Sequence, residues 1–305
     1  MKERGGVWEL KEMQTMKIQC VTKEDSEFPE KLRKLPGMPK KLYYIGKLPD
    51  PQKPSAAVVG ARMCSPYGRC MAFKYARIMA EHGVQIISGM AKGIDAEGHK
   101  GALETDTPTF AVLGSGADVC YPASNRRLYQ RILEKGGGIL TELPPGFSPQ
   151  SWAFPARNRI ISGLSDAVLV VEAKEKSGSL ITAEFAMEQG RSVYALPGAV
   201  TEELSKGCNK LIFDGAGIAY SPEIMLLEWG IQAKMPVTNV EKKKLGLAPD
   251  LDLVYSGLDL RPENLDVLIQ KTGLPAAKVC AILTELELMG LAGKAGRQYY
   301  RIHGG

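Results

Sequence analysis

The sequence predicts an α/β fold, with a Rossmann-like parallel sheet covered by helices on both faces and a small C-terminal winged-helix domain. Between residues 54 and 232, short β-branched runs alternate with helical stretches. The runs are apolar almost throughout, which is typical of parallel strands buried on both faces. After residue 249, two helical stretches precede a two-strand ribbon, which is the order of elements in a winged helix.

The elements of the sheet follow one another regularly. The predicted strands are 56–59, 84–87, 109–113, 138–141, 167–171 and 193–196, and the predicted helices are 67–82, 95–104, 125–135 and 180–189. Strands joined through helices in this way pair in parallel, with right-handed crossovers. In the tail, helices are predicted at 262–271 and 275–289, where Gly273 and Gly290 end them. Strands at 291–293 and 298–300 then flank a glycine turn.

Composition shifts divide the chain into four parts. They are an N-terminal extension and lead-in (1–53), the Rossmann-like domain (54–232), a linker rich in lysine and proline (233–249) and the winged helix (250–305). The net charge is +5, distributed as +4 over 1–53, −1 over 54–232 and +2 over 233–305. Net charge therefore does not identify a nucleic-acid-binding domain, and any basic site on the sheet has to be local.

Several classes of protein are disfavoured by composition. No apolar run reaches the roughly 18–20 residues of a membrane span, and the charged N-terminus does not resemble a signal peptide. The six cysteines are scattered without a CxxC pair, as expected of reduced thiols in a cytoplasmic protein. The three histidines lie far apart in the sequence. We therefore expect no metal site and no membrane contact.

Three glycine turns fall at the carboxyl ends of predicted strands, where open α/β sheets bind ligands. They are Gly60-Ala-Arg62, the Ser88–Gly93 loop and Gly114-Ser-Gly116. Glycine lets a backbone approach a ligand closely, and the following helix presents N–H groups to an anion. The P-loop motif is absent and no complete GxGxxG follows the first strand, so we expect no nucleotide cofactor. Alternatively, the glycines serve only the tight turns.

Arginines accompany these turns. Arg62 follows the first, Asn125-Arg126-Arg127-Leu-Tyr129 follows the third, and Phe154-Pro-Ala-Arg157-Asn158-Arg159 precedes Ile160. An arginine beside an aromatic ring offers a phosphate-binding fork together with a stacking face, which suits single-stranded nucleic acid. Solvated or ion-paired arginines are the alternative at each position.

Acid–base constellations are poor in this sequence. Ser115 between two glycines is not a GxSxG elbow. Asp95 is expected to fix the Ser88–Gly93 loop, Asp118 to cap a turn, and Glu184 to form a salt bridge on its helix. No spacing of carboxylates identifies an acid and a base, so we expect a protein that is not an enzyme.

Several motifs in order give the sequence a family resemblance. They include Val59-Gly-Ala-Arg62, Ser88-Gly-Met-Ala-Lys-Gly-Ile-Asp95, Phe154-Pro-Ala-Arg-Asn-Arg-Ile-Ile-Ser-Gly-Leu164, Ser177-Gly-Ser-Leu-Ile-Thr182 and Leu196-Pro-Gly198. The chain resembles the DprA/Smf family of DNA-processing proteins, whose members act in natural transformation. The resemblance implies a homodimer that binds single-stranded DNA without sequence preference, protects it, and helps to load the RecA recombinase.

The resemblance also assigns site residues. Arg62 is implied as the strongest DNA contact and Arg126 as the next, with Tyr129 as a stacking partner and the Gly114–Gly116 turn giving N–H groups to a phosphate. The predicted DNA-binding set is Gly60, Arg62, Ser88, Gly89, Lys92, Gly114, Ser115, Gly116, Asn125, Arg126, Arg127, Tyr129, Phe154, Arg157, Asn158 and Arg159. The predicted dimer or RecA contact is Asn209, Lys210, Leu211 and Phe213.

The sequence departs from the family in two places. Fewer than 30 residues precede Phe28, too few for the SAM-like helical domain that many members carry there. The second helix of the tail carries Lys278 but also Glu285 and Glu287. Because phosphate contacts need basic side chains, we expect protein interaction or accessory binding there in preference to sequence readout.

Two other functions compete with this hypothesis. The same superfamily includes phosphoribohydrolases of the lysine-decarboxylase-like group, whose PGGxGTxxE motif is replaced here by Ser177-Gly-Ser-Leu-Ile-Thr-Ala-Glu184. The Pro-Gly-Gly run is absent, and Glu184 lies one residue too close to Thr182. The second alternative is a transcription regulator that acts through residues 250–305.

Overall fold

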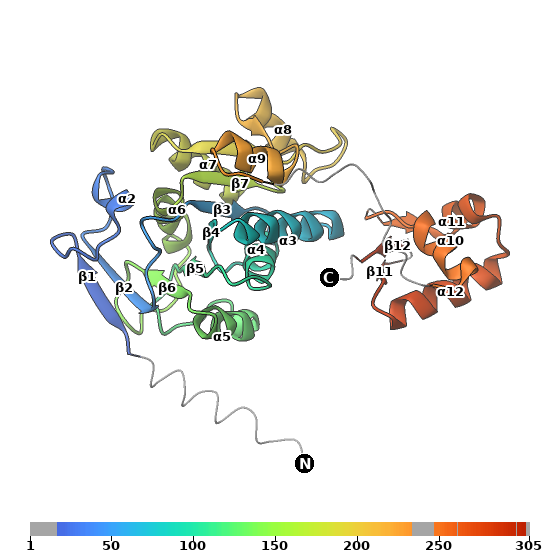
Figure 1. The fold of residues 1–305 in the computed structure, drawn as a ribbon, viewed down its shortest axis with the longest axis horizontal. Helices are drawn as coiled ribbons and strands as arrows, with labels where there is room; N and C mark the ends of the chain where they lie inside the picture. The colour runs from blue at the N-terminus through green and yellow to red at the C-terminus, as the bar shows by residue number, and fades with distance from the viewer. Residues whose placement is uncertain (1–16, 234–246, 261, 297, 303–305) are drawn as a thin grey trace, which may run out of the picture. The chain divides into compact units, whose positions relative to one another are not determined.

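A computed structural model describes residues 17–233, 247–260, 262–296 and 298–302 (Figure 1). The chain divides into two compact units, one formed mainly by residues before 235 and the other mainly by the remainder. Most of the predicted linker, residues 234–246, lies outside the described residues, as do residues 1–16.

The first unit is built on a mixed sheet of nine described strands in the order β1-β2-β6-β5-β4-β3-β7-β8-β9. The seven strands from β6 to β9 pair in parallel, whereas β1 and β2 add an antiparallel edge beside β6. The strands are β1 Gln19–Thr22, β2 Lys41–Gly46, β3 Ser55–Val59, β4 Gln85–Ser88, β5 Thr109–Val112, β6 Gly138–Thr141, β7 Ala167–Val170, β8 Ser192–Ala195 and β9 Gly217–Ile218. The predicted parallel sheet is confirmed.

Helices cover both faces of this sheet (Figure 1). They are α2 Glu30–Arg33, α3 Pro66–Glu81, α4 Ile94–Ala102, η1 Ala123–Asn125, α5 Arg126–Glu134, α6 Ala153–Leu164, α7 Gly178–Glu188, α8 Lys206–Phe213 and α9 Pro222–Glu228. Alternate residues of β5 enter different cores. Phe110 and Val112 pack with the α6–α8 side, whereas Ala111 packs with α4 and α5. Since successive side chains of a strand point to opposite faces, the apolar run of β5 is explained by burial on both.

The order of the strands reverses at β3. From β3 the chain continues through β4, β5 and β6 to one side and through β7, β8 and β9 to the other. The crevice beyond the carboxyl ends of β3 and β7 is therefore the topological switch point, which is where open α/β sheets bind ligands.

The second unit is a winged helix with its own core. Its elements are α10 Pro249–Gly257, β10 Glu263–Asn264, α11 Leu265–Thr272, α12 Ala276–Leu288, β11 Ala292–Ala295 and β12 Gln298–Arg301. Val254, Leu268, Val279 and Leu283 are buried together in that core. Gly273 takes a left-handed conformation at the end of α11, as the sequence predicted. The sequence analysis missed α10, whose Val254 supplies part of the core.

Within the described residues, no single helix combines the length and apolar character that a membrane span requires. The pair Leu265–Thr272 and Ala276–Leu288 reaches both only jointly, with a bend of 107° between its halves. The described residues contain no cluster of three or more His, Cys, Asp or Glu side chains that could hold a metal ion.

One buried histidine on α4 makes stability depend on pH. His99 is fully buried, and its Nδ1 donates to Thr109 Oγ1 at 2.7 Å while Thr109 donates to the Ile86 carbonyl. Burial, together with the nearby charge of Arg157, lowers the pKa of His99 to about 3. Between about pH 6.5 and pH 3, His99 is therefore protonated in the unfolded chain but not in the folded one. The stability that neutral His99 contributes is fully present above about pH 6.5 and is lost as the pH falls toward 3.

We expect the His99→Asn variant to lose less stability on acidification than the wild type. Asparagine can keep the hydrogen bond to Thr109 but has no proton to gain. Between pH 7 and pH 5 the wild type should lose about 2 kcal/mol more than the variant, measured by urea unfolding at both pH values. An equal loss in the two proteins would contradict this assignment.

Candidate nucleic-acid interface

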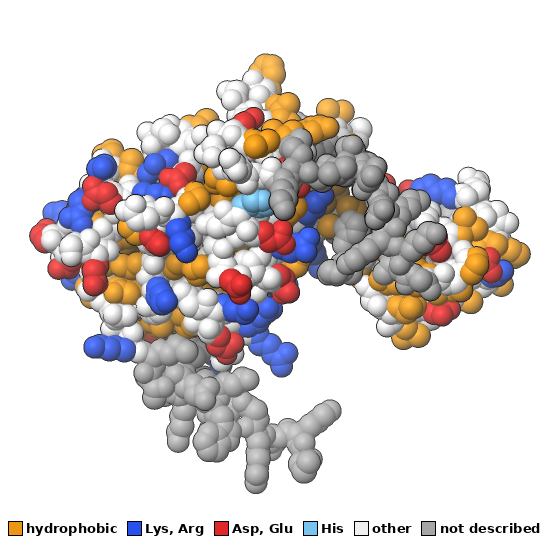
Figure 2. Space-filling view, in the orientation of Figure 1, with side chains coloured by type: hydrophobic (Ala, Val, Ile, Leu, Met, Phe, Trp, Pro, Cys, Tyr) orange, Lys and Arg blue, Asp and Glu red, His pale blue; other side chains and the backbone are white. Residues whose placement is uncertain are grey.

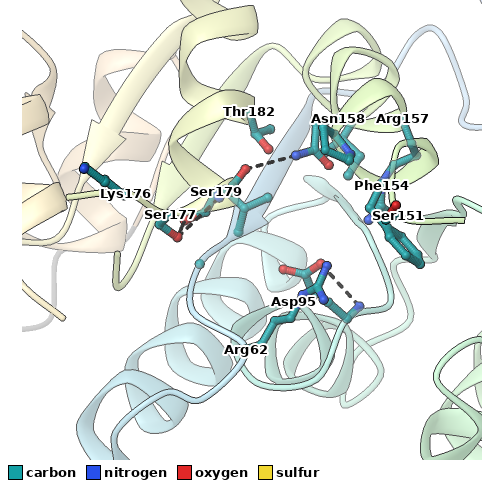
Figure 3. A pocket seen from close by; sticks show the side chains of 16 residues that line it. Arg62, Asp95, Ser151, Phe154, Arg157, Asn158, Lys176, Ser177, Ser179 and Thr182 are labelled. Carbon is teal, nitrogen blue, oxygen red and sulfur yellow. Dashed lines mark hydrogen bonds between the residues drawn. The ribbon is translucent and has the colours of Figure 1, made fainter. Parts of the chain in front are cut away.

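A cavity of about 490 Å³ opens at the switch point. Its lining comes from the end of β3, the start of α6 and the start of α7 (Figure 3). It includes Gly60, Arg62, Asp95, Ser151, Phe154, Arg157, Asn158, Ser177, Ser179 and Thr182. A second cavity of about 430 Å³ shares Arg62, Phe154 and Arg157 with the first and adds Lys92 and residues 121–124.

Arg62 and two aromatic rings form a stack between these cavities. The Arg62 guanidinium lies 5.4 Å from the centre of the Phe154 ring. Phe154 in turn stacks on Tyr121, with ring centres 5.4 Å apart and planes inclined by 27°. Arg62 and Tyr121 are exposed. A cation and flat rings are therefore presented together, which is what a phosphate and an unpaired base require.

The cations at this stack and the two arginines that begin α5 make no direct ion pair, although the charge of Arg62 acts on the Asp95 carboxylate. Among the ion pairs of the described residues, none includes Arg62, Lys92, Arg126 or Arg127. Elsewhere on the unit, blue and red side chains are interspersed over the visible face (Figure 2). Unpaired positive charge is therefore present at this site although the net charge of the domain is close to zero.

Arg157 is part of the framework of the site. Its side chain is 6% exposed, and Nη1 donates to the carbonyls of Gly89 (2.7 Å) and Val112. A side chain at position 89 would overlap the Arg157 guanidinium. Burial lowers the pKa of Arg157 to about 10 while the Asp95 charge raises it, so the group remains charged at neutral pH. Arg157 therefore ties β4 and β5 together beneath the cavities.

Two polar side chains hold the Ser88–Gly93 loop in place. Asp95 is buried and accepts from the N–H groups of Gly89 (3.2 Å) and Ala91 (3.3 Å), so its predicted role is confirmed. Burial raises the pKa of Asp95, against the opposing charge of Arg157. Asn125 Nδ2 donates to the Met90 carbonyl at 2.9 Å, and Met90 has a φ of 60°. Together these bonds present Lys92 at the rim.

Some predicted contacts are buried or already paired within the protein. Tyr129 is fully buried and donates to the Ala117 carbonyl at 2.6 Å, so it has no free ring face and the expected stacking role is wrong. Ser88 is also buried, and its hydroxyl donates to the Val58 carbonyl at 2.6 Å. Arg159 forms a two-pronged ion pair with Glu142, with N–O distances of 2.8 and 2.7 Å.

The Gly114–Gly116 turn is also directed into the protein. The Ser115 hydroxyl donates to the Val119 carbonyl, and the Gly116 N–H donates to the Phe147 carbonyl. The turn is buried and lines neither cavity. It therefore cannot supply N–H groups to a phosphate in this arrangement, and that expectation is corrected.

Sequence reasoning missed the wall formed by α7. Ser177 caps this helix, and Ser177, Gly178 and Ser179 line the switch-point cavity. Asn158, which was predicted, donates to the Gly178 carbonyl at 3.1 Å and so joins α6 to α7. The available signal was the Ser177-Gly-Ser179 run, which lies between β7 and the predicted helix 180–189.

The predicted contact segment on α8 is only partly exposed. Leu211 is buried in the core and cannot make a surface contact, which corrects that prediction. Asn209 is occupied with the backbone of Gly198, at 3.0 and 3.2 Å, and Lys210 pairs with Asp214 at 2.6 Å. Phe213, by contrast, is 89% exposed.

Comparisons with known proteins identify the family of this chain. Residues 19–230 match the family described as DNA recombination-mediator protein A. The chain belongs to this family. Residues 241–295 match the DprA winged helix domain, so both parts of the chain have counterparts in the DNA recombination-mediator protein A family.

Curated relatives cover most of the chain. Protein Smf of Escherichia coli (strain K12) is 38% identical over 91% of this chain and 76% of its own length. The DNA processing protein DprA of Streptococcus pneumoniae is 44% identical over 67% of this chain and 72% of its own. The resemblance to the DprA/Smf family is confirmed.

Solved structures of family members share the fold. The crystal structure of DprA from Streptococcus pneumoniae is 41% identical, with a TM-score of 0.66 over 73% of this chain and 77% of that one. A structure of DNA processing protein A from Helicobacter pylori, described for its single-stranded DNA binding mode, is 30% identical, with a TM-score of 0.63 over 70% of this chain and 96% of that one.

Proposed function

We propose that this protein binds single-stranded DNA without sequence preference at the switch-point surface, and that it protects incoming DNA in the cytoplasm during natural transformation. The observation that carries the proposal is the unpaired Arg62 stacked on Phe154 and Tyr121, beside two cavities. The family and the DNA binding mode described for the Helicobacter pylori relative support it.

The chemistry of the stack favours a single strand over a duplex. Aromatic faces bind bases only where the bases are unstacked, and such contacts tolerate any sequence because every base has a π-face. The surrounding cations bind the sugar-phosphate backbone, which carries no sequence information. We therefore propose binding in which the stack holds bases while Lys92, Arg126 and Arg127 hold phosphates.

The test is a salt series with a labelled single-stranded oligonucleotide and its duplex. The wild type should bind the single strand more tightly, with affinity falling steeply as salt rises. Replacing Arg126 and Arg127 together by alanine should reduce the slope of log K against log salt by about 1.4, because each phosphate contact on a single strand contributes about 0.7.

Arg131→Ala is the matched control for this series. It lies on the same helix as Arg126 and Arg127 but is paired with Glu104 at 3.3 Å. The control should keep the wild-type salt slope. Equal slopes in the double variant and the wild type would remove these arginines from the interface, and equal affinity for duplex and single strand would contradict the proposed function.

We further propose that the protein is a homodimer that helps to load RecA, with Phe213 in a protein contact. An exposed phenylalanine at the end of α8 is a typical anchor for a partner. Phe213→Asp should shift the mass measured by light scattering from dimer to monomer and slow RecA assembly on a coated single strand. Met187→Asp, at a 47% exposed position of α7, is the control; unchanged dimers in Phe213→Asp would contradict the assignment.

For the winged helix we propose accessory or protein binding. Lys278 on α12 is paired with Asp250 at 2.5 Å, and Glu285 and Leu288 are exposed on the same helix. A helix with this surface lacks the free cations that a duplex backbone requires. Sequence-specific duplex binding by this unit would contradict the proposal and support the transcription-regulator alternative.

We propose that the protein has no catalytic activity. Glu184, which the phosphoribohydrolase alternative requires, is exposed and does not line the switch-point cavity, whereas Thr182 does. Release of free base from nucleoside monophosphates, abolished by Glu184→Ala, would contradict this and support the alternative.

A further inference from the structure

Helix α7 begins in the wall of the switch-point cavity. Ser177 is its N-cap, and Gly178 and Ser179 follow along the same wall (Figure 3). The first N–H groups of a helix have no partners within it, and they attract anions together with the helix dipole. Apart from its chain neighbours and the backbone of its own helix, nothing in the described structure lies within 4 Å of the position that a Gly178 side chain would take, so a ligand can approach there.

A buried hydroxyl faces the same space. Thr182 is 1% exposed and lines the cavity one turn after Gly178. Within the described part of the chain its side chain has no hydrogen bond, unlike Ser177 and Ser179, whose hydroxyls pair with each other at 2.8 Å. Figure 3 shows the Thr182 oxygen turned toward the side where Asn158 lies. Although the residue as a whole is buried, its oxygen retains access to the cavity, so it can donate a hydrogen bond to an anionic ligand oxygen.

The charges around the cavity favour an anion. Arg62 and Arg157 both line it. The opposing carboxylate is Asp95, which is engaged by the N–H groups of Gly89 and Ala91 and whose pKa burial raises. Lys176 also lies at the margin, but Figure 3 shows its side chain extending away from the centre. The backbone and the Thr182 hydroxyl are therefore the polar groups available at the α7 wall.

We propose that the start of α7 and Thr182 form a phosphate subsite, which binds the phosphate of a nucleotide whose base lies toward Phe154. A cavity of about 490 Å³ is within the usual size range for a small-molecule site. The phosphate can come from single-stranded DNA or from a free nucleotide. The DNA source rests on the proposed function, whereas the phosphate chemistry does not.

The experiment compares thymidine, thymidine 5′-monophosphate and a single-stranded thymidine oligonucleotide by titration calorimetry. The wild type should bind the monophosphate at least about tenfold more tightly than thymidine, because hydrogen bonds to a charged group are strong. Thr182→Val should reduce that preference to within about threefold. Its melting temperature should not fall, since the hydroxyl that it loses has no partner in the protein.

Thr182→Ser is the matched control, because it keeps the hydroxyl and should keep the preference for the monophosphate. Equal affinity for thymidine and its monophosphate in the wild type, or an unchanged preference in Thr182→Val, would overturn the phosphate subsite. If the oligonucleotide binds and depends on Arg62 but no ligand depends on Thr182, the subsite fails and the proposed function stands. If only the free monophosphate binds, and does so through Thr182, the subsite stands and the proposed function fails.

Discussion

Replacing Arg157 by alanine should lower the free energy of unfolding by about 3–5 kcal/mol, the range found when one partner of a buried charge network is removed. Arg157 is almost fully buried, and its guanidinium joins the carbonyls of Gly89 and Val112. Alanine leaves both carbonyls without this donor and removes the larger of the two arginine charges that act on Asp95. Urea unfolding at pH 7 measures the loss.

Two further variants make this result interpretable. Arg157→Lys keeps the charge but cannot bridge two carbonyls with a planar fork, so its loss of stability should lie between those of the alanine variant and the wild type. Arg127→Ala removes an exposed arginine outside the described ion pairs and should change stability by no more than about 0.5 kcal/mol. Near-wild-type stability of Arg157→Ala combined with lost DNA binding would instead make Arg157 a direct contact.

The pattern of the sequence was sufficient for the parallel sheet but not for its edge. The apolar runs of β3, β5 and β7 identify strands buried on both faces without help from the rest of the chain. Strand β2 is different, because Leu42, Tyr44 and Ile45 become ordered by pairing with β1 and β6. Such pairing joins segments about 95 residues apart in sequence, and the proline-rich surroundings of β2 obscured it. Helix α10 was missed for a similar reason, since its Val254 is buried by α11 and α12.

The site was predicted where it depends on strand ends and missed where it depends on the orientation of side chains. Topology alone brings Arg62 and Phe154 to the same edge, because both follow the carboxyl ends of parallel strands. Tyr129 was wrongly predicted as a DNA contact, although the spacing of apolar residues on its helix indicated that it is buried. Leu128, Tyr129 and Ile132 recur at helical spacing and form its buried face. Treating the aromatic ring as a DNA contact overlooked that periodicity.

Replacing Arg62 by alanine should weaken binding of single-stranded DNA by at least about tenfold without changing the free energy of unfolding. Arg62 is exposed and belongs to none of the described ion pairs, so the folded protein loses little beyond one contact with Phe154. The complex loses both a phosphate contact and a cation–π partner, and together these are worth about 1.4 kcal/mol or more. Fluorescence anisotropy across a salt series measures the affinity.

Arg62→Lys and Phe154→Leu separate the two contributions of the stack. Lysine keeps the charge, so its salt slope should equal that of the wild type, whereas the slope of Arg62→Ala should be shallower by about 0.7. Leucine at position 154 leaves the Arg62 charge in place but removes the aromatic ring. Affinity for single-stranded DNA should therefore fall at every salt concentration, with the salt slope unchanged. Tight binding that survives Arg62→Ala would place the DNA elsewhere on the molecule. A loss of affinity without any change in slope would mean that Arg62 supports the rings and does not contact a phosphate.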